Sequence, residues 1–257
     1  MTALIFDCDG VLADTERDGH RLAFNRTFRE FGLPVQWSEE DYGEALAISG
    51  GKERMASLLT DDFVRQAGLP TDPTGQQEAV AAWHRRKTEI YTEMVADGLL
   101  PGRPGVARIA RDAAEEGWSM AVASTSSEAS VRAVLEHVVD ADVASGFAVL
   151  AGDVVPAKKP APDIYLLALE RLGTDPSDAL VVEDSRNGLL AAVGAELACL
   201  VTVNGYTEDQ DFSEAVLVVS SLGDPGGEPA AVLANHGAAD PGDYITLDDL
   251  AACLVAR

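Results

Sequence analysis

The sequence predicts an α/β protein with a doubly wound, mostly parallel sheet that is interrupted early by an all-helical module. Three observations support this fold class. Short runs rich in Val, Ala, Leu and Ile recur along the chain, as in buried parallel strands. Amphipathic segments of helical length separate most of these runs, which gives a repeating βαβ pattern. The segment between the first two runs is far longer than a crossover requires.

The predicted elements follow in order along the chain. Six runs are predicted to be strands: residues 2–6, 119–123, 147–152, 179–183, 199–203 and 215–219. Helices are predicted at residues 105–117, 127–139, 163–173, 187–195 and 247–256. Between the last strand and the last helix, residues 223–243 are rich in Gly, Pro and Ala. We expect them to form an exposed excursion, to which the sequence assigns no role.

The helical module is predicted to be a separate domain. Apolar residues at helical spacing occur in residues 20–32 and 78–95, and no run between residues 16 and 100 is typical of a strand. The stretch "LLPGRPG", residues 99–105, carries two prolines and two glycines, which suits a hinge. We therefore predict a core domain of residues 1–15 and 101–257, with a helical domain of residues 16–100 inserted in it.

Composition limits the classes of function. The 257 residues carry a formal charge of −24, which disfavours nucleic-acid binding and would repel phosphate esters unless a metal ion and local cations offset it. Three scattered cysteines favour a reducing compartment, and neither a membrane-spanning stretch nor a leader peptide is evident. We expect a cytoplasmic protein, and a monomer, because no heptad or exposed apolar stripe is evident.

Polar residues follow four of the predicted strands. Each has an ordinary structural explanation when taken alone: a turn, a helix N-cap or a solvated loop. The carboxyl ends of parallel strands, however, share one edge of the sheet, where open α/β sheets bind their ligands. The residues that would meet there are Asp7 and Asp9, Ser124, Lys159, and Glu183 with Asp184.

Four motifs resemble those of the haloacid-dehalogenase superfamily of phosphatases and phosphomutases: "DCDGVLADT", "ASTS", "KKPAPDIY" and "VVEDSRNG". The helical module stands where that superfamily has its cap domain. Within the superfamily the chain is similar to the CbbY-type phosphatases, which remove a phosphate from xylulose 1,5-bisphosphate, an inhibitory by-product of Rubisco chemistry. The nearer similarity lies in "DTERDGHRLAFN", "DYGEALAISGGKERM", "KTEIY", "LLPGRPGV" and "AGDVVPAKKPAPDIY".

The resemblance implies a mechanism for the core residues. Asp7 would attack phosphorus and carry it as an aspartyl-phosphate, and Asp9 would protonate the leaving group and then deprotonate the attacking water. Mg²⁺ would be held by Asp7, the backbone carbonyl of Asp9 and Asp184, with Glu183 close by. The same resemblance implies that the phosphate oxygens would be held by Ser124, the Thr125 amide and Lys159. A histidine and cysteine cluster, which zinc would require, is not evident.

Residues of the cap are predicted to bind the rest of the substrate. Gly50 and Gly51 would let backbone amides approach an anion, and Lys52 and Arg54 would add positive charge for a second phosphate. The alternative is a helix start with two solvated basic residues. The resemblance also implies substrate contacts for Glu16, His20, Tyr42 and Lys87, for which an ordinary salt-bridged helix face is the alternative.

Three other functions remain open from the sequence. The core motifs suit a β-phosphoglucomutase-like phosphomutase or a broad-specificity sugar phosphatase equally well, so the cap residues must decide. A phosphometabolite-binding module without catalysis is disfavoured, because a binder does not need both Asp7 and Asp9.

Overall fold

The computed structural model describes residues 2–97 and 99–255, so Ala256, the predicted end of the last helix, lies outside the described residues. The chain divides into two compact units. One unit, the core, is formed by Met1–Asp14 and Pro101–Arg257, and the other, the cap, is formed by Thr15–Leu100. The boundary follows Asp14, one residue earlier than the sequence predicts.

A seven-stranded sheet forms the centre of the core, in the order β3-β2-β1-β4-β5-β6-β7. Its first six strands in sequence pair in parallel, and β7 pairs antiparallel with β6 at the edge. All six predicted strands are present, which confirms the fold class. The strands are β1 (Ala3–Phe6), β2 (Ser119–Ser124), β3 (Phe147–Ala151), β4 (Ala179–Glu183), β5 (Ala198–Thr202), β6 (Leu217–Val219) and β7 (Val232–Asn235).

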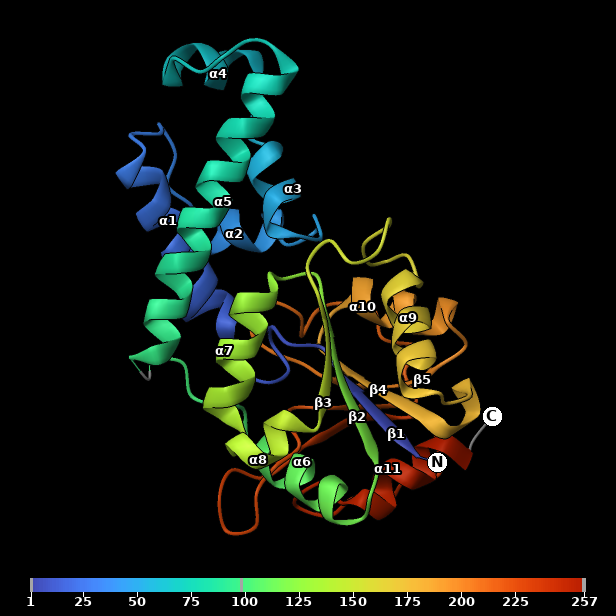
Figure 1. Ribbon diagram of the computed structural model, residues 1–257. Coiled ribbons are helices and arrows are strands. Elements are labelled where there is room, and N and C mark those ends of the chain that lie inside the picture. Colours follow the sequence, from blue (N-terminus) through green and yellow to red (C-terminus); the bar gives the residue numbers. More distant parts are fainter. Residues whose placement is uncertain (1, 98, 256–257) are drawn as a thin grey trace. The chain divides into compact units, whose positions relative to one another are not determined.

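Helices cover both faces of this sheet (Figure 1). On one face α9 (Asp163–Leu172) and α10 (Arg186–Gly194) pack on alternate strand residues such as Ile5 and Val181, which all belong to one buried cluster. On the other face α6 (Val106–Glu115) and α11 (Leu247–Val255) contact each other and strands β2 and β4. The remaining core elements are α7 (Glu128–Val138), α8 (Ala141–Ser145) and a 3₁₀ turn, η2 (Pro176–Asp178). Burial on both faces explains the unbroken apolar runs of the strands.

The segment between residues 223 and 243 is largely exposed at residues 232–235, as predicted, but it contains a strand there that the sequence analysis did not predict. Strand β7 pairs with β6 through Leu217↔Asn235 and Val218↔Ala234. The sequence did not reveal it because an edge strand exposed on its outer side lacks the apolar pattern of a buried one. Val232 and Leu233 are 43% and 56% exposed.

The chain after β6 packs against the start of α6. The Gly105 amide donates to Asp224 Oδ2 at 2.8 Å, and the Arg108 guanidinium donates to the Gly223 carbonyl at 2.7 Å. Gly105 has φ +83°, and a Cβ at this position would lie 2.4 Å from the Gly223 oxygen and 2.6 Å from Leu222 Cβ. The glycine-rich stretch is therefore docked on the segment where the chain re-enters the core.

The cap is helical throughout its described residues, as predicted. Its longest helix, α5, contacts α1 and α3 (Figure 1), and an aromatic cluster of Phe24, Phe28, Trp37 and Tyr42 fills part of its interior. Asp72 caps α5 by accepting from the Gly75 amide, and Pro73 occupies the first helical position. The elements are a π-helical turn η1 (Glu16–His20), α1 (Arg21–Glu30), α2 (Glu39–Ala45), α3 (Gly51–Ala56), α4 (Asp61–Ala67) and α5 (Pro73–Ala96).

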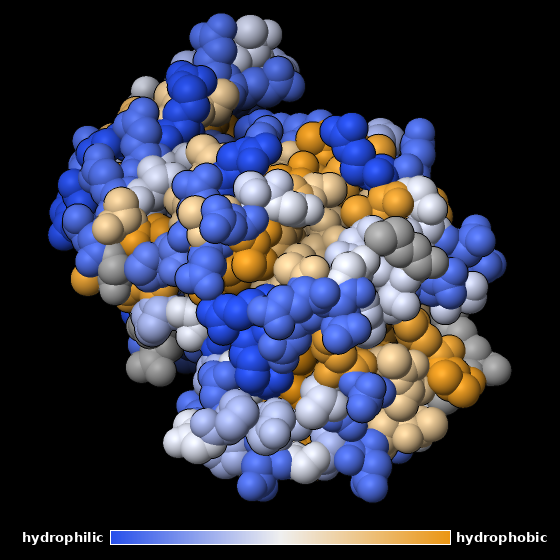
Figure 2. All heavy atoms as spheres, turned by 60° about the horizontal axis from the view of Figure 1, so that its bottom comes forward, coloured by the Kyte–Doolittle hydropathy of each residue, from blue (hydrophilic) through white to orange (hydrophobic). Residues whose placement is uncertain are grey.

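Much of the surface is hydrophilic. Figure 2 shows a face on which hydrophilic residues predominate and apolar residues gather in smaller areas between them. Among the residues that the structure describes, no helix combines the length and the apolar character needed to cross a membrane.

Replacing Gly105 with alanine should destabilise the protein more than the same change at Gly173. Both glycines have positive φ, but nothing lies within 4 Å of a Cβ built at Gly173. Gly173→Ala should therefore cost about 1–2 kcal/mol of backbone strain, whereas Gly105→Ala should cost roughly a further 1–3 kcal/mol because the backbone at residues 222 and 223 must move. Equilibrium urea unfolding of both variants measures the difference. Equal losses would show that residues 222 and 223 give way freely.

Candidate active site

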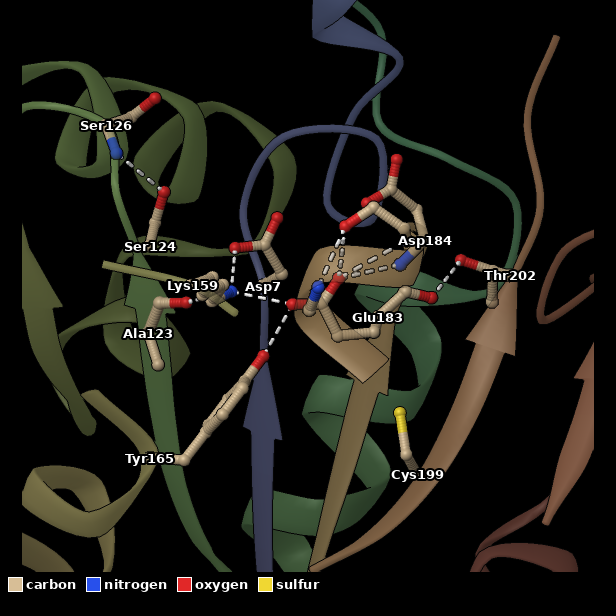
Figure 3. Close-up of polar contacts among 12 residues, drawn as sticks. Asp7, Ala123, Ser124, Ser126, Lys159, Tyr165, Glu183, Asp184, Cys199 and Thr202 are labelled. Atoms are coloured by element: carbon tan, nitrogen blue, oxygen red, sulfur yellow. Dashed lines mark hydrogen bonds and ion pairs between the residues drawn. The ribbon is translucent and has the colours of Figure 1, made fainter. Parts of the chain in front are cut away.

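The polar residues predicted from the strand ends do meet at the carboxyl edge of the sheet (Figure 3). Asp7 directly follows β1, Ser124 ends β2, and Glu183 ends β4 with Asp184 after it. Lys159 comes from the loop between β3 and α9. Parallel strands deliver these side chains to one place because all of them point the same way.

Lys159 lies at the centre of the cluster. Its Nζ donates to Asp7 Oδ1 at 2.7 Å, to Glu183 Oε1 at 2.6 Å and to the Ala123 carbonyl at 2.9 Å. The side chain is only 5% exposed. Three acceptors thus use all three donors of the ammonium group, and two of these acceptors are carboxylates.

Glu183 is fully buried and held from several sides. Besides Lys159, Tyr165 donates its hydroxyl to Glu183 Oε1 at 2.6 Å, and the Asp184 amide donates to Oε2 at 3.0 Å. A Cβ built at Gly188 would lie 1.8 Å from Glu183 Oε1, so only glycine leaves room for this carboxylate. Glu183 is therefore fixed in position by its surroundings.

Three carboxylates of this edge could hold a metal ion. Asp7, Glu183 and Asp184 each offer one oxygen, and these oxygens lie within 4.8 Å of one another in a buried group. Asn204 Nδ2 donates to Asp184 Oδ2 at 2.6 Å and so orients that carboxylate. Three buried acids beside one lysine leave an excess of negative charge, and hard oxygen donors are the ligands that Mg²⁺ prefers. The donor set fits a divalent cation.

The side chain of Asp9 contacts the loop after β2. Ser126 donates its hydroxyl to Asp9 Oδ2, and the Ser126 amide donates to Ser124 Oγ at 3.1 Å. Asp9 is partly exposed, Ser124 is buried and Thr125 is partly exposed. The loop after β2 therefore places the Ser124 hydroxyl and the Asp9 carboxylate on either side of Ser126.

Burial and charge shift the pKa values of the cluster. Burial raises the pKa of Asp7 to about 7; Lys159 opposes this rise, while the charges of Glu183 and Asp9 add to it. Burial alone would lower the pKa of Lys159, but the carboxylates of Asp7 and Glu183 outweigh it and raise that pKa. Lys159 therefore stays protonated, and burial makes the ionisation of Asp7 costly.

Two buried polar groups lie inside the cap. Tyr42 donates its hydroxyl to Glu16 and accepts from Arg54 Nη1 at 2.9 Å, and Arg54 also donates to the Ala45 and Ile48 carbonyls. In the second group Lys87 Nζ lies 2.6 Å from His20 Nδ1, and Tyr91 stacks on the His20 ring at 4.0 Å. Five of the predicted cap residues thus belong to compact polar clusters: Glu16, Tyr42 and Arg54 in one, and His20 and Lys87 in the other.

The glycine pair and Lys52 are placed differently. Gly50 is the N-cap of α3 and has φ +93°. Gly51 lies beside His84, because a Cβ built at Gly51 would be 3.2 Å from the His84 ring. Lys52 lines a groove of about 420 Å³ with residues of α3 and the first half of α5, including Gln76 and Gln77. Residues two apart on a helix point about 200° apart, so the structure does not bring Lys52 to the Arg54 cluster.

Sequence reasoning did not single out three residues that shape the site. Tyr165 is the last residue of the quoted motif "KKPAPDIY" and lies in the first turn of α9, and its place in that motif was the available signal. Asn204 and Ser126 follow β5 and β2, where the strand-end argument already applied. Their partners, Asp184 and Asp9, follow other strands, β4 and β1, and only the fold shows these pairings.

Known proteins are similar in sequence to this chain over most of its length. A sequence model of the haloacid dehalogenase-like hydrolases matches residues 1–196. The CBBY-like protein of Arabidopsis thaliana is 47% identical over 87% of this chain and 70% of its own length. The plasmid protein CbbY of Cupriavidus necator is 42% identical over 88% of this chain and 87% of its own length.

A solved structure agrees with these relatives. CbbY from Rhodobacter sphaeroides, crystallised as a variant in complex with xylulose 1,5-bisphosphate, is 39% identical in sequence with a TM-score of 0.75. The similarity covers 86% of this chain and 94% of that one.

Without metal, replacing Asp7 with asparagine should stabilise the fold at pH 8 more than at pH 5. The folded protein keeps a proton on Asp7 up to about pH 7, whereas the group's ordinary value is 3.8. Ionising Asp7 therefore costs stability as the pH rises through that window, and the full cost is present above it. Asparagine never ionises and can still accept from Lys159. Melting temperatures in EDTA at both pH values measure the effect.

The control is Asp209→Asn, which removes an exposed carboxylate of the core. It should show no comparable gain at pH 8. A gain from Asp7→Asn that is equal at both pH values would contradict the raised pKa of Asp7.

Proposed function

The chain belongs to the haloacid dehalogenase-like hydrolase family, and within it to the CbbY group, and we propose that it hydrolyses xylulose 1,5-bisphosphate at C1 to xylulose 5-phosphate and phosphate. The observation that carries the reaction is the buried cluster of Asp7, Lys159, Glu183 and Asp184 at the carboxyl edge of the sheet. The substrate is supported by the similarity to the CbbY that was solved with this sugar bisphosphate.

Asp7 is the proposed nucleophile. Lys159 binds its Oδ1, which leaves Oδ2 as the oxygen that attacks phosphorus. The new bond joins this oxygen to phosphorus, the bond from phosphorus to the C1 oxygen breaks, and an aspartyl-phosphate remains on the chain. Water then attacks the same phosphorus, which releases phosphate and restores the carboxylate.

Asp9 is the proposed acid and base. It would give its proton to the departing C1 oxygen and then take one from the attacking water. The hydrogen bond from Ser126 fixes its carboxylate, which spares the reorientation of a flexible side chain during the reaction.

The negative charge of the transferred phosphoryl group must be balanced by positive charge, which this acidic chain provides only close to the site. Ser124, the Thr125 amide and Lys159 are proposed to hold the non-bridging oxygens. Mg²⁺, held by Asp7, Asp184 and the Asp9 carbonyl with Glu183 near, would supply the remaining positive charge.

The cap is proposed to recognise the second phosphate. The core site uses its cations on the phosphate that is cleaved, so the other end of the sugar needs its own. The cap encloses two buried cations, Arg54 beside Tyr42 and Glu16, and Lys87 beside His20. Both side chains carry the positive charge that a charge-assisted hydrogen bond to a second phosphate requires.

A panel of sugar mono- and bisphosphates tests the proposed function. Purified protein with Mg²⁺ should release phosphate from xylulose 1,5-bisphosphate far faster than from xylulose 5-phosphate, ribulose 1,5-bisphosphate or glucose phosphates. EDTA and the Asp7→Asn variant should each abolish turnover. Isomerised sugar phosphate without free phosphate would indicate a phosphomutase instead, and a preference for monophosphates would indicate a general sugar phosphatase.

Replacing Asp9 with asparagine should slow both halves of the reaction. Asparagine can neither protonate the leaving oxygen nor deprotonate water, and each of these contributions is worth about 10²–10⁴-fold in rate. Rapid-quench measurement of the first turnover reports the first half, and steady-state phosphate release reports the whole cycle. A wild-type first turnover in Asp9→Asn would rule out Asp9 as the acid.

Replacing Arg54 with lysine should reduce the preference for bisphosphate over monophosphate about tenfold to hundredfold, which corresponds to one lost charge-assisted hydrogen bond of about 1.5–3 kcal/mol. Because remote binding energy also promotes the chemical step, kcat should fall together with a rise in KM. Slow hydrolysis of p-nitrophenyl phosphate should remain.

The matched control is Lys52→Ala on the same helix. It removes a cation that lines a different surface, so the preference should persist. Loss of the preference in Lys52→Ala, with retention in Arg54→Lys, would assign the phosphate to the groove at Lys52.

A further inference from the structure

Arg103 makes an unusual set of contacts that the proposed mechanism does not use. It is the third residue of the core after the cap, and its guanidinium donates to four backbone carbonyls. Nη1 donates to Gly10 at 2.5 Å and Thr202 at 3.3 Å, and Nη2 donates to Val203 at 2.7 Å and Ser220 at 2.5 Å.

These carbonyls belong to three different loops at the carboxyl edge of the sheet. Gly10 lies in the loop after β1, Thr202 and Val203 lie where β5 ends, and Ser220 directly follows β6. In sequence they are 93 to 117 residues away from Arg103. One side chain therefore holds together segments that the sheet alone leaves separate, since β1 and β5 are both neighbours of β4 but not of each other.

Two of these loops carry residues of the proposed active site. Gly10 follows Asp9, the proposed acid and base. Val203 precedes Asn204, whose amide donates to Asp184 at 2.6 Å. The loops also touch, because a Cβ built at Gly10 would lie 2.1 Å from Asp184 Oδ2 and 2.7 Å from Asn204 Nδ2.

We propose that Arg103 is a positioning residue, which fixes the loop carrying Asp9 against the loop through which Asn204 orients Asp184. The proposal rests on the phosphatase activity proposed above. Arg103 is not proposed to touch the substrate or the reacting atoms. It acts by fixing the loop with the acid and base against Asn204 on the other loop, which in turn orients the carboxylate of Asp184 after β4.

The backbone of Arg103 strengthens the same link. Its amide donates to the Leu12 carbonyl at 2.9 Å, and Gly102 forms a β-bridge with Ala13. Side chain and main chain thus hold the β1 loop at two points. Burial lowers the pKa of Arg103, and the charge of Asp184 is the first to oppose this. The guanidinium therefore also lies within the electrostatic reach of the acidic cluster.

Lysine cannot replace this geometry. The planar guanidinium directs two nitrogens at carbonyls of three loops, whereas an ammonium is a point charge that can donate at most three bonds from one atom. Arg103→Lys keeps the charge and removes the fork, so it isolates positioning from electrostatics.

The experiment compares Arg103→Lys with Arg108→Lys. Arg108 is a matched control in the same re-entry segment, whose guanidinium contacts Leu222, Gly223, Asp112 and Asp224. For each variant, thermal shift without substrate gives the Mg²⁺ concentration of half-maximal stabilisation. Turnover of xylulose 1,5-bisphosphate gives kcat. Circular dichroism and the metal-free melting temperature report the fold.

Arg103→Lys should raise the Mg²⁺ half-point and lower kcat, each about tenfold, as expected for residues that orient metal ligands. Arg108→Lys should lower only the melting temperature. If the two variants lose stability alike and keep wild-type Mg²⁺ half-points, Arg103 is merely structural and the proposal is overturned.

Two further measurements complete the test. If Arg103→Lys does not fold, Arg103→Gln gives the same comparison, because the glutamine amide can still donate two hydrogen bonds. If neither variant folds, Arg103 is a folding determinant and the proposal is overturned. The Mg²⁺ half-point needs no substrate. A wild-type protein that binds Mg²⁺ but cleaves none of the sugar phosphates would therefore refute the proposed function and still leave the role of Arg103 decided.

Discussion

The contact of Lys159 with Asp7 and Glu183 is the constraint on which the active-site edge depends. Two carboxylates can be buried this close together only because one ammonium neutralises part of their charge. Lys159 also binds the Ala123 carbonyl near the end of β2. The ion cluster therefore joins the loop after β3 to the ends of β1, β2 and β4, and the chemistry and the local architecture share the same bonds.

The residues around this cluster restrict the positions of its carboxylates. Gly188 gives Glu183 its space, Tyr165 holds one of its oxygens and Asn204 holds Asp184. A site that handles phosphate in a chain of charge −24 cannot rely on a general positive field. It must place a few cations accurately, and that accuracy comes from the rigid edge of a parallel sheet.

The sequence predicted the sheet and the core site because both follow from local patterns. Apolar runs mark buried strands, and a polar residue after each run marks the common edge, so Asp7, Ser124 and Glu183 could be found without a structure. Arg103 could not be found in this way, because its partners are backbone carbonyls about a hundred residues away and leave no trace in residue type. Strand β7 escaped notice for a different reason, because its exposed residues lack the apolar pattern of a buried strand.

Strand β1 is synthesised long before the two strands that pair with it. This central strand is made first, yet its two neighbours begin at Ser119 and Ala179. The apolar segment Ala3–Phe6 must therefore stay unpaired on a ribosome-bound chain while the whole cap is translated. The cap is continuous in sequence, so it can fold before the rest of the core has been synthesised. Pairings so distant along the chain make assembly of the sheet slow relative to the helices. During this interval the nascent protein exposes the residues that later become its most protected.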